Sequence, residues 1–166
     1  DRARDVLEKR YGLGKSPATH TLESIGQTYG ITRERVRQIE NYGIQAIQKS
    51  DVYTDSQEIF DDLKEAVEKL GGVIGEETLL EELGKDKSTR NHIYFLLVLG
   101  SPFLRQKENS AFHHRWYIEK KVFDEVEKAL KSCSDCEHYL ACELRTDYIK
   151  SVYNSMSKGD TGGFEF

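Results

Sequence analysis

The sequence predicts a mainly α-helical protein: a helix-turn-helix domain followed by a winged-helix-like domain and C-terminal helices. Apolar residues recur at helical spacing through most of the chain, and glycines or short polar stretches end each of these segments. Beyond Pro102 the spacing of apolar residues changes to every second position, which is typical of strands. The 166 residues, 37% of them hydrophobic, suffice for two small domains with modest cores.

The first domain is predicted at residues 1–50 and contains three helices. The first helix covers residues 2–11, where an apolar stripe runs between charged residues and a glycine follows. Thr21 begins the second helix, which ends at a tight turn in residues 29–31. The third helix covers residues 32–50, so the domain has the order of a helix-turn-helix with one extra helix in front.

The start of the third helix carries side chains suited to reading DNA bases. At 3.6 residues per turn, Val36, Ile39 and Gly43 face inward. The outward residues are two arginines that can fork onto guanine, a glutamate that can accept from cytosine and a glutamine that can pair with adenine: Arg33, Arg37, Glu34 and Gln38. Thr32 offers an N-cap oxygen, and a helix entering the major groove presents its N-terminal residues in this way. The alternative is a solvated helix face held by arginine–glutamate pairs.

Three blocks of this domain resemble the fourth conserved region of bacterial housekeeping-type sigma factors. The blocks are residues 4–13, 20–26 and 32–40, and they follow the order and spacing of that family. The resemblance implies that the last helix recognises the minus-thirty-five hexamer of double-stranded promoter DNA. It also implies contact with the flap of the bacterial RNA polymerase core.

The resemblance further implies roles for individual residues. Those expected to contact bases are Arg33, Glu34 and Gln38. Those expected to contact the DNA backbone are Thr21, Leu22, Glu23, Thr32, Arg35 and Arg37. Base contacts specify the sequence, whereas phosphate contacts position the protein and make its affinity depend on salt.

The chain departs from this family in two respects. Family members usually continue the last helix with several basic residues, whereas residues 41–48 of this chain are uncharged, so we expect weak isolated affinity for DNA. In the family this domain comes last, whereas here more than a hundred residues follow it. The melting region and clamp helix of a complete sigma factor are absent from these residues, so the alternative is the latter part of an atypical sigma factor.

Charge is distributed unevenly along the chain. Residues 1–50 contain nine Lys or Arg and six Asp or Glu, whereas the rest of the chain contains fifteen and twenty-three. We therefore expect DNA affinity in the first domain and protein contacts in the acidic remainder. No apolar run approaches the ~20 residues that cross a bilayer, and no secretory signal begins the sequence, so we expect a cytoplasmic protein of the bacterial nucleoid.

The second domain is predicted at residues 57–131, after a polar linker at residues 51–56. Its elements follow the order of a winged helix: helices at residues 59–70, 76–83 and 91–99, a short strand at residues 73–75, and a hairpin of strands at residues 103–106 and 112–118. An amphipathic helix at residues 121–130 follows the hairpin. The domain is loosely similar to the module of the bacterial RNA polymerase delta subunit.

Two functions remain open for this second domain. One is DNA contact through basic residues around its third helix and its wing: Lys87, Arg90, Arg105, Lys107 and Arg115. The other is docking on a protein, with the third helix as part of the core. The local excess of acidic residues favours docking.

The last part of the chain is predicted to be a cysteine-containing helical extension at residues 132–154 and a flexible tail at residues 155–166. The extension holds a set of residues with metal-ligand chemistry: Cys133, Cys136, His138 and Cys142. Cys-x2-Cys is half of a tetrahedral zinc site, and thiolates at such spacings also hold iron–sulfur clusters. The alternative is three reduced cysteines without a metal, because the usual second Cys/His pair is missing.

The sequence contains no catalytic motif, so we expect no enzyme. It has no phosphate-cradling glycine loop, no paired helix histidines with a glutamate, and no nucleophile with a placed base. The leading hypothesis is a transcription regulator that reads promoter DNA and contacts RNA polymerase. The alternative is an interaction factor that docks on RNA polymerase with little DNA binding of its own.

Overall fold

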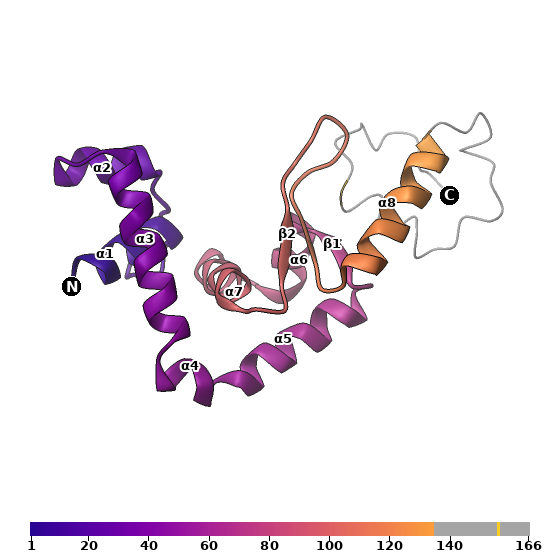
Figure 1. The fold of residues 1–166 in the computed structure, drawn as a ribbon, viewed down its shortest axis with the longest axis horizontal. Coiled ribbons are helices and arrows are strands. Elements are labelled where there is room, and N and C mark those ends of the chain that lie inside the picture. The colour runs from indigo at the N-terminus through magenta and orange to yellow at the C-terminus, as the bar shows by residue number, and fades with distance from the viewer. Residues whose placement is uncertain (135–155, 157–166) are drawn as a thin grey trace. The chain divides into compact units, whose positions relative to one another are not determined.

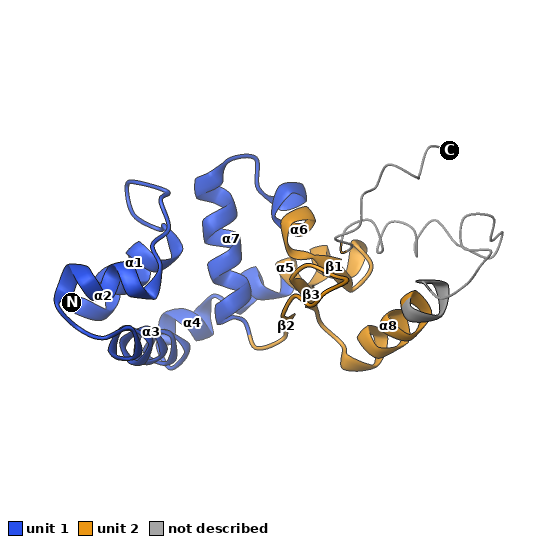
Figure 2. Cartoon of the chain, turned by 90° about the horizontal axis from the view of Figure 1, so that it is seen from above, with its two compact units in different colours: residues 1–61, 80–100 blue, residues 62–79, 101–166 orange. Residues whose placement is uncertain are grey.

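The computed structural model describes residues 1–134 and Met156, which form two compact units (Figure 2). Unit 1 comprises residues 1–61 and 80–100. Unit 2 comprises the described part of residues 62–79 and 101–166. The first unit therefore combines two segments of the chain that are separated by 18 residues.

Unit 1 is built from helices (Figure 1). They are α1 (Arg2–Tyr11), α2 (Leu22–Tyr29), α3 (Arg33–Gln48), α4 (Asp51–Asp55) and α7 (Lys87–Leu99), together with the start of α5 (Gln57–Lys69) and the end of α6 (Glu76–Leu83). The three helices predicted for the first domain are confirmed, with ends within two residues of the prediction.

The helix-turn-helix packs around a small apolar core. Val6 of α1, Ile25 of α2 and Val36 of α3 are almost completely buried against one another. Gly30 ends α2 in the left-handed conformation, at φ 63°, which favours glycine. A Cβ on Gly26 would lie 2.7 Å from the carbonyl oxygen of Ile31, so the close approach of this turn also needs glycine.

Residues 51–55 form the short helix α4, although their polar composition predicts a linker at residues 51–56. Ser50 caps α4, because its Oγ accepts a hydrogen bond from the backbone N–H of Tyr53 at 3.3 Å. The ring of Tyr53 packs on that of Phe60, with centroids 4.9 Å apart, and its hydroxyl donates to the carbonyl of Leu99. These tertiary contacts explain why a polar stretch is ordered as a helix.

Unit 2 contains an antiparallel three-stranded sheet of β1 (Val73–Gly75), β2 (Leu104–Gln106) and β3 (Arg115–Tyr117). The strand order is β1-β3-β2, with Ile74 and Arg105 both opposite Trp116. The elements follow one another as α5, β1, α6, α7, β2 and β3, which confirms the predicted winged-helix order.

The core of unit 2 lies between this sheet and α8 (Lys120–Ser134). Phe123 of α8 stacks on Tyr117 of β3 with ring centroids 4.3 Å apart. Phe112, Leu130 and Met156 are buried in the same cluster. Most of the predicted extension and tail, residues 135–155 and 157–166, lies outside the described residues, and the predicted domain boundaries stay predictions.

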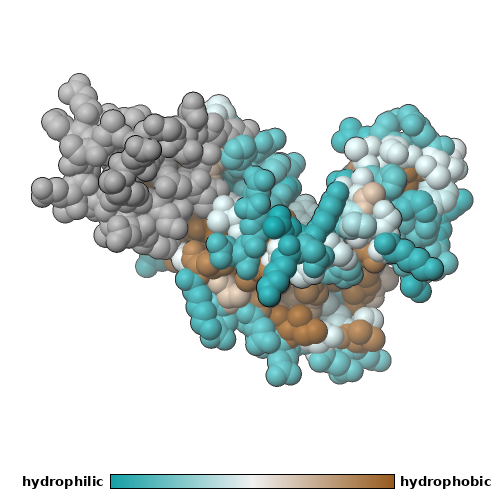
Figure 3. All heavy atoms as spheres, turned by 180° about the vertical axis from the view of Figure 1, so that it is seen from behind, coloured by the Kyte–Doolittle hydropathy of each residue, from teal (hydrophilic) through white to brown (hydrophobic). Residues whose placement is uncertain are grey.

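None of the described helices is both long enough and apolar enough to cross a membrane. The described part of the face in Figure 3 is mostly hydrophilic, with several smaller apolar patches. Among the exposed large apolar residues of the described chain are Val52 of α4 and Ile59 of α5, which are 72% and 50% exposed.

Candidate nucleic-acid interface

The first half of α3 presents the predicted DNA-contacting side chains to solvent. Its exposed residues there are Arg33, Glu34, Arg35, Arg37 and Gln38. Val36, in the middle of this stretch, is 0% exposed and packs in the helix-turn-helix core. The first half of α3 therefore has a polar face toward solvent and an apolar face, with Val36, toward the core, as the apolar spacing predicts.

Both helices of the motif begin with a threonine cap. The Oγ1 of Thr32 accepts a hydrogen bond from the backbone N–H of Arg35 at 3.2 Å. The Oγ1 of Thr21 accepts one from the N–H of Ser24 at 3.1 Å. The remaining first-turn N–H groups and the positive end of each helix dipole favour phosphate.

The predicted backbone-contacting residues of α2 are placed differently from one another. Thr21 and Glu23 are exposed, whereas Leu22 is half-buried and packs against the helix-turn-helix core. The side chain of Leu22 is therefore directed inward, and its main chain is the part that stands at the start of the helix.

Two of the predicted DNA-contacting residues are held by each other. The carboxylate of Glu34 accepts from Arg37 Nε at 2.9 Å and from Arg37 Nη2 at 2.6 Å. These hydrogen bonds lower the pKa of Glu34 and raise the pKa of Arg37. In free protein, the Arg37 guanidinium is thus occupied by a carboxylate from its own helix.

A second pair lies beside the first one. The Nη1 of Arg35 donates to Oε1 of Gln38 at 3.0 Å, and both side chains are exposed. Four of the five polar side chains are therefore oriented by neighbours on the same helix, at i, i+3 spacing.

A buried carboxylate that sequence reasoning missed fixes α3 against α1. Glu40 is 8% exposed, and its Oε1 accepts from the Tyr11 hydroxyl at 2.9 Å and from Arg10 Nε at 3.3 Å. Burial and the nearby carboxylate both raise the pKa of Tyr11. Glu40 follows Val36 by four residues, and this helical spacing could have predicted that Glu40 lies on the inner face.

Close packing of α1 on α3 depends on a glycine. A Cβ on Gly43 would lie 2.9 Å from Cδ1 of Leu7 and 3.6 Å from Cβ of Ala3. The helices can approach this closely only because position 43 has no side chain. The inward direction predicted for Gly43 is confirmed by its burial.

The basic residues predicted as contacts of the second domain are not brought together in one unit. Lys87 and Arg90 belong to unit 1, whereas Arg105, Lys107 and Arg115 belong to unit 2. Lys87 and Lys107 are exposed. Arg90 is half-buried and donates through Nε to the carbonyl of Gly84 at 2.8 Å.

The predicted contact of Arg115 with DNA is wrong. Its side chain is 1% exposed, lies over the rings of Phe112 and Phe123, and donates to Glu127 Oε1 at 2.8 Å. Burial lowers the pKa of Arg115. A guanidinium enclosed in the core of unit 2 cannot reach a phosphate.

Arg105, predicted as a DNA contact on the wing, is paired with a carboxylate. Its Nε and Nη2 donate to the two carboxylate oxygens of Glu76 at 2.6 and 2.8 Å. The indole N–H of Trp116 donates to the same carboxylate at 2.9 Å. This network ties β2 and β3 to the start of α6 and neutralises the charge of Arg105.

The predicted metal ligands fall at the edge of the described chain. Cys136, His138 and Cys142 lie outside the described residues, and of Cys133 only its place in the last turn of α8 is described. Among the described residues, no group of three or more His, Cys, Asp or Glu is placed to hold a metal ion.

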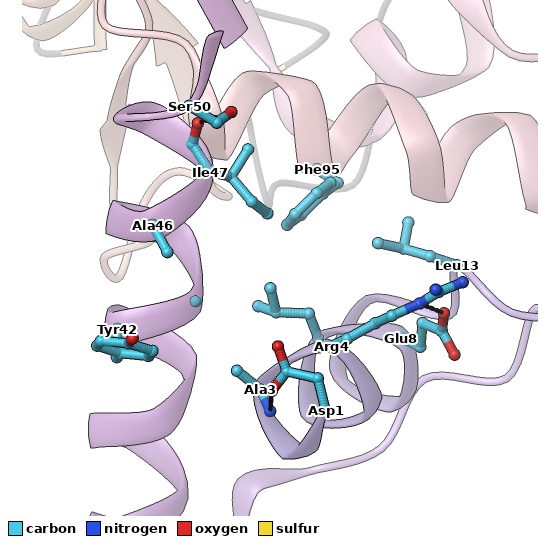
Figure 4. Close-up of a pocket in the computed structure, with 12 residues that line it drawn as sticks. Asp1, Ala3, Arg4, Glu8, Leu13, Tyr42, Ala46, Ile47, Ser50 and Phe95 are labelled. Atoms are coloured by element: carbon cyan, nitrogen blue, oxygen red, sulfur yellow. Dashed lines mark hydrogen bonds and ion pairs between the residues drawn. The ribbon is translucent and has the colours of Figure 1, made fainter. Parts of the chain in front are cut away.

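An apolar groove of about 530 Å³ lies on unit 1, between α1, the second half of α3 and α7 (Figure 4). Its apolar lining includes Ala3, Leu7, Leu13, Ala46, Ile47 and Phe95. Arg4 and Glu8 stand at its edge as an ion pair with a 2.8 Å separation between Nε and Oε1. The volume and the apolar lining are typical of a ligand or helix-binding site.

Comparison with known proteins finds similarity within the first 49 residues. Residues 1–49 match the family described as Sigma-70, region 4, which confirms the resemblance found in the sequence. Over 40 residues, 24% of this chain, the sequence is 52% identical to the RNA polymerase sigma factor SigA of Listeria monocytogenes. That stretch covers 10% of the relative, so the similarity spans a small part of its length. No solved structure matches the chain.

Proposed function

We propose that this chain is a non-enzymatic transcription factor that recognises a minus-thirty-five-like promoter element, because residues 1–49 match the Sigma-70, region 4 family. In this proposal α3 enters the major groove, and the protein works at the bacterial nucleoid in contact with RNA polymerase. The observation that carries the proposal is the first half of α3, where five polar side chains suited to DNA are exposed above a buried anchor.

Each exposed side chain has a role that its chemistry supports. Arg33 would fork onto the O6 and N7 acceptors of guanine, Gln38 would pair with adenine, and Glu34 would accept from the amino group of cytosine. Arg35 and Arg37 would contact phosphates, as would the starts of α2 and α3 at Thr21 and Thr32.

The test begins with in vitro selection of bound duplexes by the full chain. Arg33→Ala and Gln38→Ala should each relax base preference at one position, a loss of about 1–3 kcal/mol on the selected duplex. Arg37→Ala should weaken selected and random duplexes alike and reduce the salt slope by about 1. The matched control is Gln45→Ala, an exposed glutamine on the second half of α3, which should change neither. Equal losses on selected and random duplexes for all three variants would refute these roles.

A second candidate function is docking on RNA polymerase with little independent DNA binding. Two observations favour it: the apolar groove on unit 1 and the uncharged residues 41–48 of α3, which leave few cations for phosphates. We propose the flap of the polymerase core as the surface that meets this groove. Capture of core polymerase without measurable duplex binding at low salt would favour this function over promoter recognition.

A further inference from the structure

Asn41 lies on the exposed face of α3, one turn beyond the residues that we expect to read bases. It follows Gln38 by three residues and Glu34 by seven. Seven residues of an α-helix turn through about 700°, which is within about 20° of two full turns. Asn41 is therefore almost in line with Glu34 along the helix. The contacts implied by the family resemblance do not include it.

The packing of α3 on α1 fixes the direction of Asn41. Glu40, the residue before it, is 8% exposed and accepts two hydrogen bonds from side chains of α1. Gly43, two residues after it, is buried in close contact with α1. Successive residues of a helix are about 100° apart, so a helix that directs Glu40 and Gly43 inward directs Asn41 outward. Asn41 thus shares the outer face with Glu34 and Gln38.

The side-chain amide of Asn41 is free to meet a base. The carboxylate of Glu34 accepts from Arg37, and Oε1 of Gln38 accepts from Arg35. No such hydrogen bond ties the Asn41 amide to another residue of the described chain. Asn41 can therefore offer both its donor and its acceptor to DNA without giving up an internal contact.

Asn41 also lies within the reach of the major groove. A helix rises ~1.5 Å per residue, so Asn41 is about 10.5 Å along α3 from Glu34, and the groove is about 12 Å wide. Gln45, on the same face, is about 16.5 Å from Glu34 and exceeds that width. Some major-groove helices, such as that of homeodomains, read bases at i, i+3, i+4 and i+7. Glu34, Arg37, Gln38 and Asn41 have this spacing.

We infer that Asn41 reads an adenine in the major groove, one step beyond the base pair that Gln38 contacts. Its Nδ2 donates to N7 of the adenine, and its Oδ1 accepts from the N6 amino group. The adenine lies on the side of the Gln38 contact that is farther from Arg33, because Asn41 follows Gln38 along the helix. This inference rests on the proposed promoter recognition and adds one position to the sequence that is read.

The test compares in vitro selection of duplexes by the full chain and by Asn41→Ala. The unchanged chain should prefer adenine at one position by at least about fivefold, since a bidentate pair discriminates by that factor or more, and Asn41→Ala should accept any base there. Asn41→Arg should select guanine at the same position, because a guanidinium forks onto O6 and N7 of guanine. The matched control is Gln45→Ala, which should select the same site as the unchanged chain.

A modified base tests the hydrogen bond itself. 7-Deazaadenine lacks the N7 acceptor but still pairs with thymine. At the selected position it should weaken binding of the unchanged chain by about two- to tenfold, the effect of one lost hydrogen bond, and should not affect Asn41→Ala. Asn41 is exposed and alanine is the better helix former, so Asn41→Ala should keep the melting temperature of the unchanged chain or raise it slightly.

The outcomes separate this inference from the function on which it rests. If Asn41→Ala keeps the preference of the unchanged chain at every position, Asn41 reads no base and the inference is overturned, while promoter recognition stands as long as Arg33→Ala relaxes its own position. Equal losses by Asn41→Ala on selected and random duplexes would also overturn it, since a phosphate contact behaves in this way. If the unchanged chain selects no sequence, the proposed function fails and the inference fails with it.

Discussion

A single carboxylate links α1 to α3, the helix that carries most of the predicted DNA contacts. Glu40 is buried in α3 and accepts hydrogen bonds from Tyr11 and Arg10 of α1. A buried charge is stabilised only while its partners remain, since loss of a partner leaves the desolvation cost uncompensated. The orientation of α3 therefore depends on the hydroxyl of Tyr11.

Tyr11→Phe should lower the stability of unit 1 by about 1–3 kcal/mol, because a buried carboxylate loses one of its donors. Hydrogen exchange of the α3 amides measures this as faster opening. Tyr42→Phe is the matched control, since that tyrosine is 69% exposed, and it should change opening by less than about 0.5 kcal/mol. Additive effects of Tyr11→Phe and Glu40→Gln in a double-mutant cycle would show that the two residues do not act together.

The pair of Glu34 and Arg37 predicts a second effect at the scale of single residues. Glu34→Gln removes a negative charge from the predicted DNA-facing side and frees Arg37 for phosphate, so affinity for random duplexes should rise by about two- to tenfold. The salt slope should stay the same, because Arg37 contacts the same phosphate in both proteins and only its pairing with Glu34 is removed. Unchanged affinity would mean that Glu34 does not hold Arg37 back from the phosphate.

The same pair gives a pH dependence whose sign follows from its pKa shifts. Hydrogen bonds from Arg37 lower the pKa of Glu34, so the pair is complete above the ordinary value of 4.5 and is lost as pH falls through the lowered one. Between pH 6 and 8 this pair should therefore not change.

At the scale of elements, the contact between α1 and α3 is set by the absence of a side chain at Gly43. Gly43→Ala would improve helix propensity by about 1 kcal/mol, but the new Cβ would lie 2.9 Å from the buried Leu7. Overpacking of a closed core costs about 1–3 kcal/mol, so we expect net destabilisation. Hydrogen exchange of the α1 and α3 amides measures this destabilisation. The control is Gly14→Ala, where nothing lies within 4 Å of the new Cβ; stabilisation by Gly43→Ala would contradict the packing argument.

The elements that the sequence predicted well are those whose signals are local. Helical spacing and the caps at Thr21 and Thr32 defined α2 and α3. The start of α7 was predicted four residues late, because the cap at Asp86 precedes the apolar run by several polar residues. Residues 51–56 were predicted as a linker because their composition is polar, and α4 forms through contacts with Phe60 and Leu99.

The residues that the sequence did not predict depend on distant partners. Nothing near Glu40 in the sequence indicates Tyr11 as its donor, since the two are 29 residues apart. Arg115 lies in a strand whose three residues are all buried, although a charged residue in a strand is usually exposed, and its partner Glu127 lies 12 residues further along the chain. Asn91 showed no signal either, because its acceptors are backbone carbonyls 74 and 79 residues away.

At the scale of the whole molecule, unit 1 is assembled from two separate segments of the chain. A fragment of residues 1–79 keeps every residue of the sigma-like domain but lacks α7 and the four hydrogen bonds that Asn91 and Leu99 make with Gly12, Pro17, Gln48 and Tyr53. We expect the α1 and α3 amides of this fragment to exchange at least about tenfold faster than in the full chain. The loss of one hydrogen bond, a net ~1 kcal/mol, already raises the exchange rate several-fold, and the fragment loses four. Equal exchange rates in the fragment and the full chain would show that the first segment is stable alone.

This discontinuity also sets the order of events while the protein is being made. The roughly fifty residues from Gln48 to Leu99 take about 3–10 s to synthesise at 5–20 residues per second. During that interval the nascent polypeptide already holds α3, yet Tyr11 lacks Phe95 to pack on and the carbonyls of Gly12 and Pro17 lack the side chain of Asn91. Residues 1–49 can therefore complete their packing only after α7, which comes well after them in the sequence, has been translated.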